Sequence, residues 1–414
     1  NWKYALLGAT FFGLSTYFYI IIAAGHNGKV ATLVYFAPLL AGILLVYIHK
    51  KYILGFIVTS LFMGLQICAN HPQMTYYLFL ALGFLFLSEL IRAATGKTPW
   101  KHFFISSGVL GLALILGVGM NSQRLLANSE YVKETIRGKQ ILKSEHNSKD
   151  DDGMKKQEIL NWSYGKLETL NLFIPRLLGG SSTEEVSDDF KKELRASLES
   201  QTDDEEQIQA VFDQVANGVP MYWGDQPGTS GPAYQGAIVV FLAILGFFFA
   251  WKKYRYWILG ASILTILLAW GSNFLPLSDL FIDYVPLYNK FRAPSSILVV
   301  VELLFPLIAI IGLYRFYNDE KLTEEYKQKI LLYVGGSVLG ITLLIILFAK
   351  SLFGFEGAAE TGKIPDFIMT VIKDERARML RIDAIKAFIY VLITFGVLFL
   401  SLKKKISQNI ALII

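Results

Sequence analysis

Histidine, arginine, aspartate and amide side chains gather in four short segments, each of which adjoins a long apolar run. These segments are residues 25–28, 70–73, 222–232 and 289–295. Glycine and proline in them account for the chain reversals, but turn formation alone does not require imidazole, guanidinium or carboxylate groups. These side chains are therefore the first candidates for chemistry.

His26, His71 and Arg292 suit the recognition of a phosphate. Imidazole groups bind phosphate oxygens and also serve as acid or base near neutral pH. A guanidinium beside a helix start, where free backbone amides point outward, is well placed for a phosphate or pyrophosphate. Two alternatives stay open: the histidines only cap helix ends, or Arg292 forms an ion pair with Asp279 or Asp283.

Trp223 and Asp225 suit a saccharide, because the indole offers an apolar ring face and the carboxylate accepts hydrogen bonds from hydroxyl groups. Asp225 is also the candidate catalytic base. The alternative is a structural turn anchored by an interfacial tryptophan. The side chains predicted to bind saccharide are Asn27, Asn70, Gln73, Tyr76, Trp223, Gln226 and Asn289.

The sequence lacks the motifs of several other kinds of site. There is no phosphate-binding glycine loop followed by Lys-Ser/Thr, no zinc-spaced His/Cys set and no Gly-x-Ser-x-Gly turn. The triplet at residues 150–152 is explained by a solvated acidic turn, since no second ligand cluster accompanies it, although a divalent metal stays open. The net charge of +5 arises from Lys and Arg beside apolar runs, so we do not expect a nucleic-acid partner.

The elements that must position these residues are membrane spans. Hydrophobic residues make up 53% of the 414 residues and charged residues only 18%, a composition that favours the lipid bilayer as the surrounding medium. We predict an all-α polytopic membrane protein with about ten transmembrane helices, since a span needs about 17 to 25 apolar residues. The predicted spans cover residues 4–23, 32–48, 52–69, 75–91, 103–120, 233–251, 256–270, 297–314, 330–348 and 384–402.

The spans define three regions in sequence order. Residues 1–120 hold five spans, residues 121–232 form a polar insert, and residues 233–414 hold the remaining spans with an external segment at 350–383. Within the insert, the patterns predict helices over 188–200 and 203–216. A further amphipathic helix is expected at 373–383, where it would lie on lipid headgroups.

Lysine and arginine gather in every second short loop. The basic loops are residues 49–51, 92–101, 252–255, 315–329 and 403–405. By the positive-inside rule they face the cytoplasm. The insert and the four polar segments are therefore expected on the extracytoplasmic side.

The polar segments, with residues 13–17 and 236–238, also resemble the YfhO family of bacterial integral membrane proteins. The motifs are Gly13-Leu14-Ser15-Thr16-Tyr17 with Gly25-His26-Asn27, Ala69-Asn70-His71-Pro72-Gln73-Met74-Thr75-Tyr76-Tyr77, Trp223-Gly224-Asp225-Gln226-Pro227 with Gly236-Ala237-Ile238, and Asn289-Lys290-Phe291-Arg292-Ala293-Pro294-Ser295. The resemblance extends to Arg381-Ile382-Asp383-Ala384. That family is similar to the GT-C superfamily of polytopic glycosyltransferases.

The resemblance implies transfer of a sugar from a polyprenyl-phosphate donor to an extracytoplasmic envelope glycan, lipid or protein, in the bacterial cytoplasmic (inner) membrane. Arg292, His26 and His71 would bind the donor phosphate, and a carboxylate would deprotonate the acceptor in an inverting reaction. GT-C enzymes carry this carboxylate, as base or metal ligand, in the first external loop, whereas residues 25–31 contain no Asp or Glu. We therefore expect this group in a segment upstream of Asn1. A lipid or polysaccharide transporter and a non-catalytic scaffold of envelope assembly are the alternative functions.

Overall fold

The computed structural model describes residues 2–138 and 153–413, and these residues form helices and loops with no strand among them. Seven helices are long and apolar enough to cross a membrane, or eight if α13 (Lys252–Ala269) and residues Gly271–Tyr284, bent by 113°, count as one span. The prediction of an all-α, multi-pass membrane protein is confirmed. The acidic triplet at 150–152 lies outside the described residues.

The chain folds into two compact units, each assembled from segments that are distant in sequence. Unit 1 comprises Asn1–Ala24, Gly165–Trp251 and Phe305–Ile414, and unit 2 comprises Gly25–Tyr164 and Lys252–Leu304. The division by sequence order at residues 120 and 232 stays a prediction, because it separates spans from insert rather than one compact unit from another.

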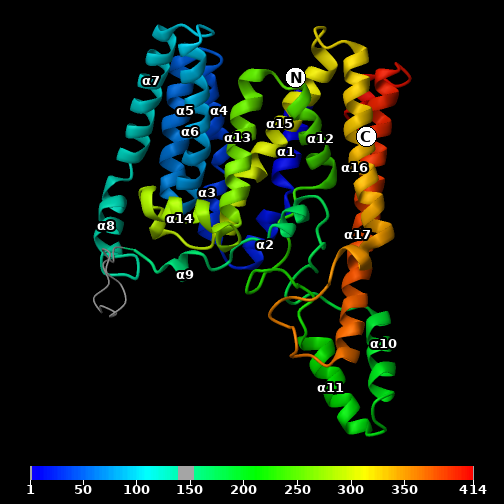
Figure 1. Cartoon of the computed structure of the whole chain (residues 1–414). Helices are drawn as coiled ribbons and strands as arrows, with labels where there is room; N and C mark the ends of the chain where they lie inside the picture. Colours follow the sequence, from blue (N-terminus) through cyan, green and yellow to red (C-terminus); the bar gives the residue numbers. More distant parts are fainter. Residues whose placement is uncertain (1, 139–152, 414) are drawn as a thin grey trace. The chain divides into compact units, whose positions relative to one another are not determined.

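In unit 2 the central helices pack closely, with α5 against both α4 and α7, and α6 against α13 (Figure 1). Glycine makes this approach feasible: a Cβ on Gly55 would lie 2.9 Å from the carbonyl oxygen of Gly42. The helices of unit 2 are α3 (Asn27–Leu33), α4 (Phe36–Tyr47), α5 (Tyr52–Cys68), α6 (Pro72–Ala94), α7 (Trp100–Gly119), α8 (Ser122–Val132), α9 (Lys156–Ile159), α13, η2 (Gly271–Phe274), α14 (Leu275–Tyr284), η3 (Tyr288–Lys290) and η4 (Pro294–Leu298).

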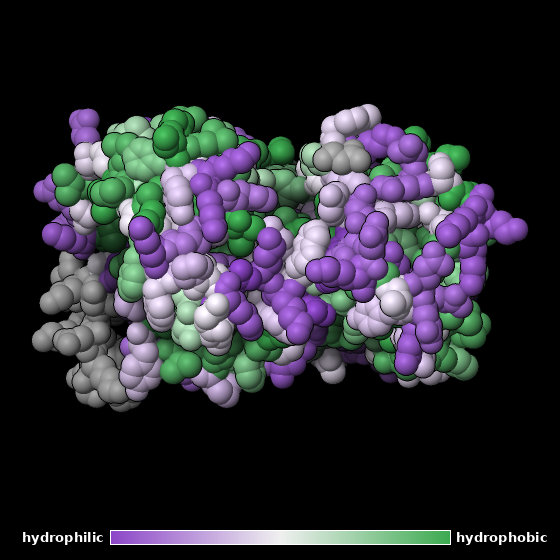
Figure 2. Space-filling model, turned by 90° about the horizontal axis from the view of Figure 1, so that it is seen from above, coloured by the Kyte–Doolittle hydropathy of each residue, from purple (hydrophilic) through white to green (hydrophobic). Residues whose placement is uncertain are grey.

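The basic loops of unit 2 meet at one end of this bundle. Arg92 forms an ion pair with Glu89 across 3.3 Å, and both lie close enough to Lys253 to interact with its charge. Figure 2 looks onto the end where these loops lie, and hydrophilic side chains gather on it. The basic loops at residues 92–101 and 252–255 therefore lie near each other, while the side of the membrane that they face stays a prediction.

In unit 1 the long helices α16 (Glu324–Leu352) and α17 (Asp366–Leu402) run side by side (Figure 1). The other helices are α1 (Trp2–Gly13), α2 (Thr16–Ala23), η1 (Leu167–Leu172), α10 (Asp188–Glu199), α11 (Glu205–Gly218), α12 (Ala237–Phe249) and α18 (Gln408–Ala411). The helix α15 (Val299–Asn318) begins in unit 2 and ends in unit 1.

The first half of α17 is covered by α10 and α11. Phe190 and Leu194 of α10, Ile208 of α11, and Ile372 and Met379 of α17 share one apolar core. The helices predicted over 188–200 and 203–216 are thus confirmed as α10 and α11. Residues 373–383, expected as a separate helix on lipid headgroups, are instead part of α17, because their apolar side packs in this core.

A glycine contact joins α12 and α15 within unit 1. A Cβ on Gly312 would lie 2.4 Å from the Cα of Gly246, and a Cβ on Gly246 would lie 2.4 Å from the carbonyl oxygen of Ile308. Backbones can approach this closely only at small residues, as in other membrane helix pairs.

We therefore expect Gly312→Val to force α12 and α15 apart and to lower the thermal unfolding temperature of the detergent-solubilised protein by several degrees. Gly336→Val is the matched control, since nothing lies within 4 Å of a Cβ at that position. An equal loss of stability in both variants would contradict a specific role for the contact.

Candidate functional site

Two of the polar segments meet in unit 2. The Gln73 amide nitrogen donates to the carbonyl oxygen of Arg292 at 2.6 Å and to the hydroxyl of Tyr77 at 2.8 Å. The Tyr76 hydroxyl donates to the carbonyl oxygen of Pro286 at 3.0 Å, and its ring lies 5.1 Å from that of Phe291. The start of α6 therefore fixes the backbone that presents Arg292.

His26 and His71 occupy the N-cap positions of α3 and α6, and neither side chain makes a capping hydrogen bond. Helix capping, the alternative explanation for both residues, is therefore not their role in this structure. In the part of the chain that is described, the buried Nδ1 atom of His71 has no hydrogen-bond partner. Both imidazoles thus keep capacity for a ligand.

Positive charge surrounds the two imidazoles. Burial, Lys29 and Arg292 lower the pKa of His26. Burial lowers the pKa of His71 to about 4, with Lys29, His26 and Arg137 adding to the shift. Both imidazoles are therefore neutral at neutral pH and act there as hydrogen-bonding groups, while Lys29, Arg137 and Arg292 carry the charge. We call these five residues the cation cluster.

The lowered pKa of His71 predicts an acid-dependent stability. An exposed histidine in the unfolded chain has a pKa near 6.5, so between that value and about 4 the unfolded state binds more protons than the folded state. Stability is then fully present above pH 6.5 and falls as the pH drops through this window. We expect His71→Asn to flatten this fall in pH-dependent thermal unfolding, whereas His49→Asn, an exposed histidine in another loop, leaves it unchanged.

Arg292 is exposed, and among the described residues its guanidinium makes no ion pair. Asp279, one alternative partner, pairs instead with Lys156 across 2.5 Å. Leu287 and Ala293, on either side of Arg292, have φ values of 68° and 57°. Non-glycine residues in this left-handed region are strained and concentrate at functional sites.

The predicted saccharide residues of unit 2 have mixed roles. Gln73 and Tyr76 hold the backbone that carries Arg292, as described above. Asn70 accepts a hydrogen bond from Asn128 of α8 at 2.7 Å. The Asn289 carbonyl oxygen accepts from the backbone of Met154 at 3.1 Å, and Asn27 is exposed in the first turn of α3. Sugar binding by these side chains stays a prediction.

Two members of the cation cluster escaped sequence reasoning. Lys29 is half-buried and donates to the Ser296 hydroxyl at 3.2 Å, and Arg137 donates to the carbonyl oxygen of Lys290 at 3.0 Å. Lys29 was detectable as the single basic residue of the loops at 25–31 and 70–74. Arg137 did not stand out in the sequence in the same way, because it lies among many other charged residues of the insert.

Unit 1 contains the remaining polar segment, and a buried carboxylate organises it. Glu168 is 2% exposed and accepts hydrogen bonds from the Tyr222 hydroxyl at 2.9 Å, the Gln226 amide at 2.8 Å and the Gly165 backbone at 2.9 Å. Burial, above all, raises its pKa to about 7, with a smaller contribution from Asp225. Sequence reasoning missed Glu168, because the side chains that donate to it, Tyr222 and Gln226, are more than 50 residues away in sequence.

Trp223 is held in place within unit 1. Its backbone nitrogen donates to the carbonyl oxygen of Leu178 at 3.0 Å, and its ring lies 5.5 Å from that of Phe355. The indole nitrogen is buried, and no described residue accepts from it. The ring thus packs on protein and still has a donor to offer, whereas Asp225 is exposed.

Arg376 of α17 fixes the start of this segment. The side chain is fully buried and donates to the carbonyl oxygens of Pro220, Met221 and Phe355 at 2.7 to 3.0 Å. It also forms a two-pronged ion pair with Glu360 at 2.6 and 2.8 Å. One guanidinium therefore ties α17 to two loops.

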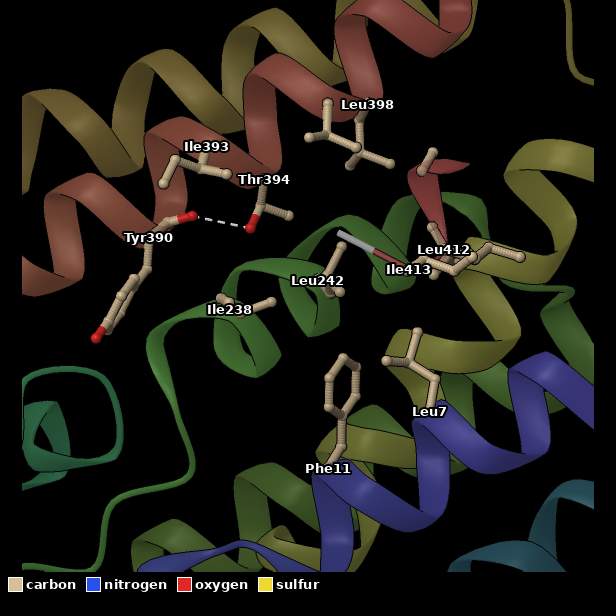
Figure 3. A pocket seen from close by; sticks show the side chains of 13 residues that line it. Leu7, Phe11, Ile238, Leu242, Tyr390, Ile393, Thr394, Leu398, Leu412 and Ile413 are labelled. Carbon is tan, nitrogen blue, oxygen red and sulfur yellow. Dashed lines mark hydrogen bonds between the residues drawn. The ribbon is translucent and has the colours of Figure 1, made fainter. Parts of the chain in front are cut away.

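A separate cavity of about 340 Å³ lies among α1, α12, α15, α17 and α18 in unit 1 (Figure 3). Its walls are mainly aliphatic, and the Thr394 hydroxyl is engaged with the carbonyl oxygen of Tyr390 at 2.8 Å. None of the predicted site residues lines it. The cavity and the predicted site residues are therefore different places in the structure.

These features define the class of protein as an all-α, multi-pass membrane protein with a cation cluster and a buried carboxylate in its loops. No protein-family model, curated protein or solved structure matches the chain. Within residues 2–138 and 153–413, no three His, Cys, Asp or Glu side chains come together as a metal site requires.

Proposed function

We propose that the protein is a membrane glycosyltransferase of the GT-C type that moves a sugar from a polyprenyl-phosphate donor to an envelope glycan, lipid or protein. The observation that supports it best is the cation cluster of unit 2. Three cationic side chains beside two neutral imidazoles suit a phosphate, because charge and hydrogen-bond donors act on the same oxygens.

The proposal includes a finer topology. Besides the seven long spans, α5, α12 and the bent α13–α14 pair would cross the membrane, which gives ten crossings in a GT-C-like arrangement. The basic loops would face the cytoplasm. The cation cluster and the insert would then be extracytoplasmic, in the cytoplasmic membrane of a bacterium.

In the proposed reaction the cation cluster stabilises the leaving polyprenyl phosphate. A carboxylate removes the proton from an acceptor hydroxyl, the resulting oxygen attacks the anomeric carbon, and the bond from that carbon to the phosphate oxygen breaks. Asp225 is the candidate for this carboxylate among the described residues.

The test is a transfer assay with the protein in liposomes that contain a radiolabelled polyprenyl-phosphate sugar and an envelope lipid acceptor. Formation of a new glycoside together with free polyprenyl phosphate supports the proposal. Movement of unmodified donor across the bilayer without bond formation would identify a transporter instead. A phenotype that survives simultaneous substitution of His26, His71 and Arg292 would favour the scaffold function.

A further inference from the structure

Two carboxylates converge on one glycine in unit 1. A Cβ on Gly165 would lie 3.0 Å from Oδ2 of Asp225 and 3.4 Å from Oε2 of Glu168. The carboxylate oxygens therefore occupy the space that a side chain at residue 165 would fill. A buried carboxyl group and the exposed carboxyl group of Asp225 therefore lie near the same glycine, close enough for their charges to interact.

The donor and the acceptor of each hydrogen bond around Glu168 can be assigned. The Gln226 backbone N–H donates to the Tyr222 hydroxyl oxygen at 3.0 Å, so the Tyr222 hydroxyl hydrogen is available to Oε1 of Glu168, at 2.9 Å. The Gln226 side-chain amide donates to the same oxygen. With the Gly165 N–H on Oε2, Glu168 accepts three hydrogen bonds, which suits its ionised form, while burial favours its neutral form.

We propose that Glu168 is the positioning residue behind Asp225, and that its ionisation sets the strength with which the Asp225 carboxylate attracts a proton from an acceptor hydroxyl. The inference rests on the proposed transferase function for its catalytic consequence. The pairing of the two carboxylates does not depend on that function.

The direction of the effect follows from charge. Among the residues that the structure describes, the titratable groups that act on Glu168 are Tyr222, which donates to it, and Asp225. When Glu168 is neutral, the proton that leaves the acceptor hydroxyl is attracted by the carboxylate of Asp225 alone. When Glu168 is ionised, the same proton is attracted by two carboxylates. Because the pKa of Glu168 is raised to about 7, the change falls near neutral pH. Burial lowers the pKa of His71 to about 4, well below this change, and burial also lowers the pKa of His26 below its ordinary value.

The first experiment measures the pairing without any assay of activity. In infrared difference spectra of the whole protein, a protonated-carboxyl band should disappear as the pH rises through about 7 and should be absent in Glu168→Gln. Asp225→Asn removes the neighbouring negative charge and should move this titration to lower pH. Glu193→Gln, at an exposed carboxylate of α10, should change nothing. A band that is unaltered in Glu168→Gln, or a titration that Asp225→Asn does not move, would overturn the pairing.

The second experiment measures the catalytic consequence. The kcat of transfer should rise roughly three- to tenfold between about pH 6 and pH 8 in the native protein, and this rise should vanish in Glu168→Gln. Tyr222→Phe removes a donor to the ionised form and should shift the rise to higher pH. A purely structural Glu168 would lower activity in both variants without moving the rise, and that result would overturn the inference. Absence of transfer by the native protein at every pH would instead refute the proposed function, leaving the infrared titration to decide the pairing.

Discussion

Arg292→Ala is expected to lower the kcat of transfer from a polyprenyl-phosphate sugar by roughly 10²- to 10³-fold, the usual cost of losing one group that stabilises developing negative charge. The guanidinium is exposed and makes no ion pair among the described residues, so its loss should leave the fold intact. Arg292→Lys should recover part of the rate, since it keeps the charge but loses the paired donors that suit a phosphate.

The control for this prediction is Lys133→Ala, which removes an exposed cation of the insert outside the cation cluster. It should retain full kcat. Thermal unfolding should give the same midpoint for Arg292→Ala as for the native protein. Full transfer activity in Arg292→Ala would refute phosphate stabilisation by the cluster.

Arg376→Met should cause the largest loss of stability in unit 1. The substitution leaves Glu360 without its ion-pair partner. It also leaves the carbonyl oxygens of Pro220, Met221 and Phe355 without the donor that Arg376 supplies. Removing one partner of a buried ion pair costs about 3–5 kcal/mol. We expect this loss in denaturant unfolding followed by tryptophan fluorescence, with a large change around Trp223.

Arg195→Met is the control for Arg376→Met, because Arg195 also pairs with glutamates, Glu199 and Glu205, but on the exposed surface. Surface pairs contribute little, so its unfolding midpoint should not change measurably. Equal midpoints for Arg376→Met and the native protein would show that the buried pair is replaceable by apolar packing.

Much of the fold was predictable because membrane spans have a strong local pattern. A span is recognised from an apolar run of sufficient length and from the basic loops beside it, and both can be read from residues that are adjacent in sequence. The helices α10 and α11 also have a local signal, because each begins with acidic residues in its first turn. It was not predictable that α17 begins well before its apolar half, since the charged first half is buried by packing against α10 and α11.

The candidate sites were predictable only where a side chain looked out of place locally. His26, His71 and Arg292 stood out from their turns, and the structure brings them close to one another in unit 2. Glu168 and Arg376 did not stand out. Their roles arise from hydrogen bonds to residues far away in sequence, and a charged residue in a polar stretch gives no indication of such burial.

The continuous helix α17 also acts as a spacer of fixed length. Its 37 residues give a rod of about 55 Å at about 1.5 Å per residue, whereas the hydrocarbon core of a bilayer is only about 30 Å thick. The helix is thus longer than an upright crossing needs, and its first half packs against α10 and α11. A longer or shorter α17 would therefore change how far α10 and α11 lie from the apolar half of this helix.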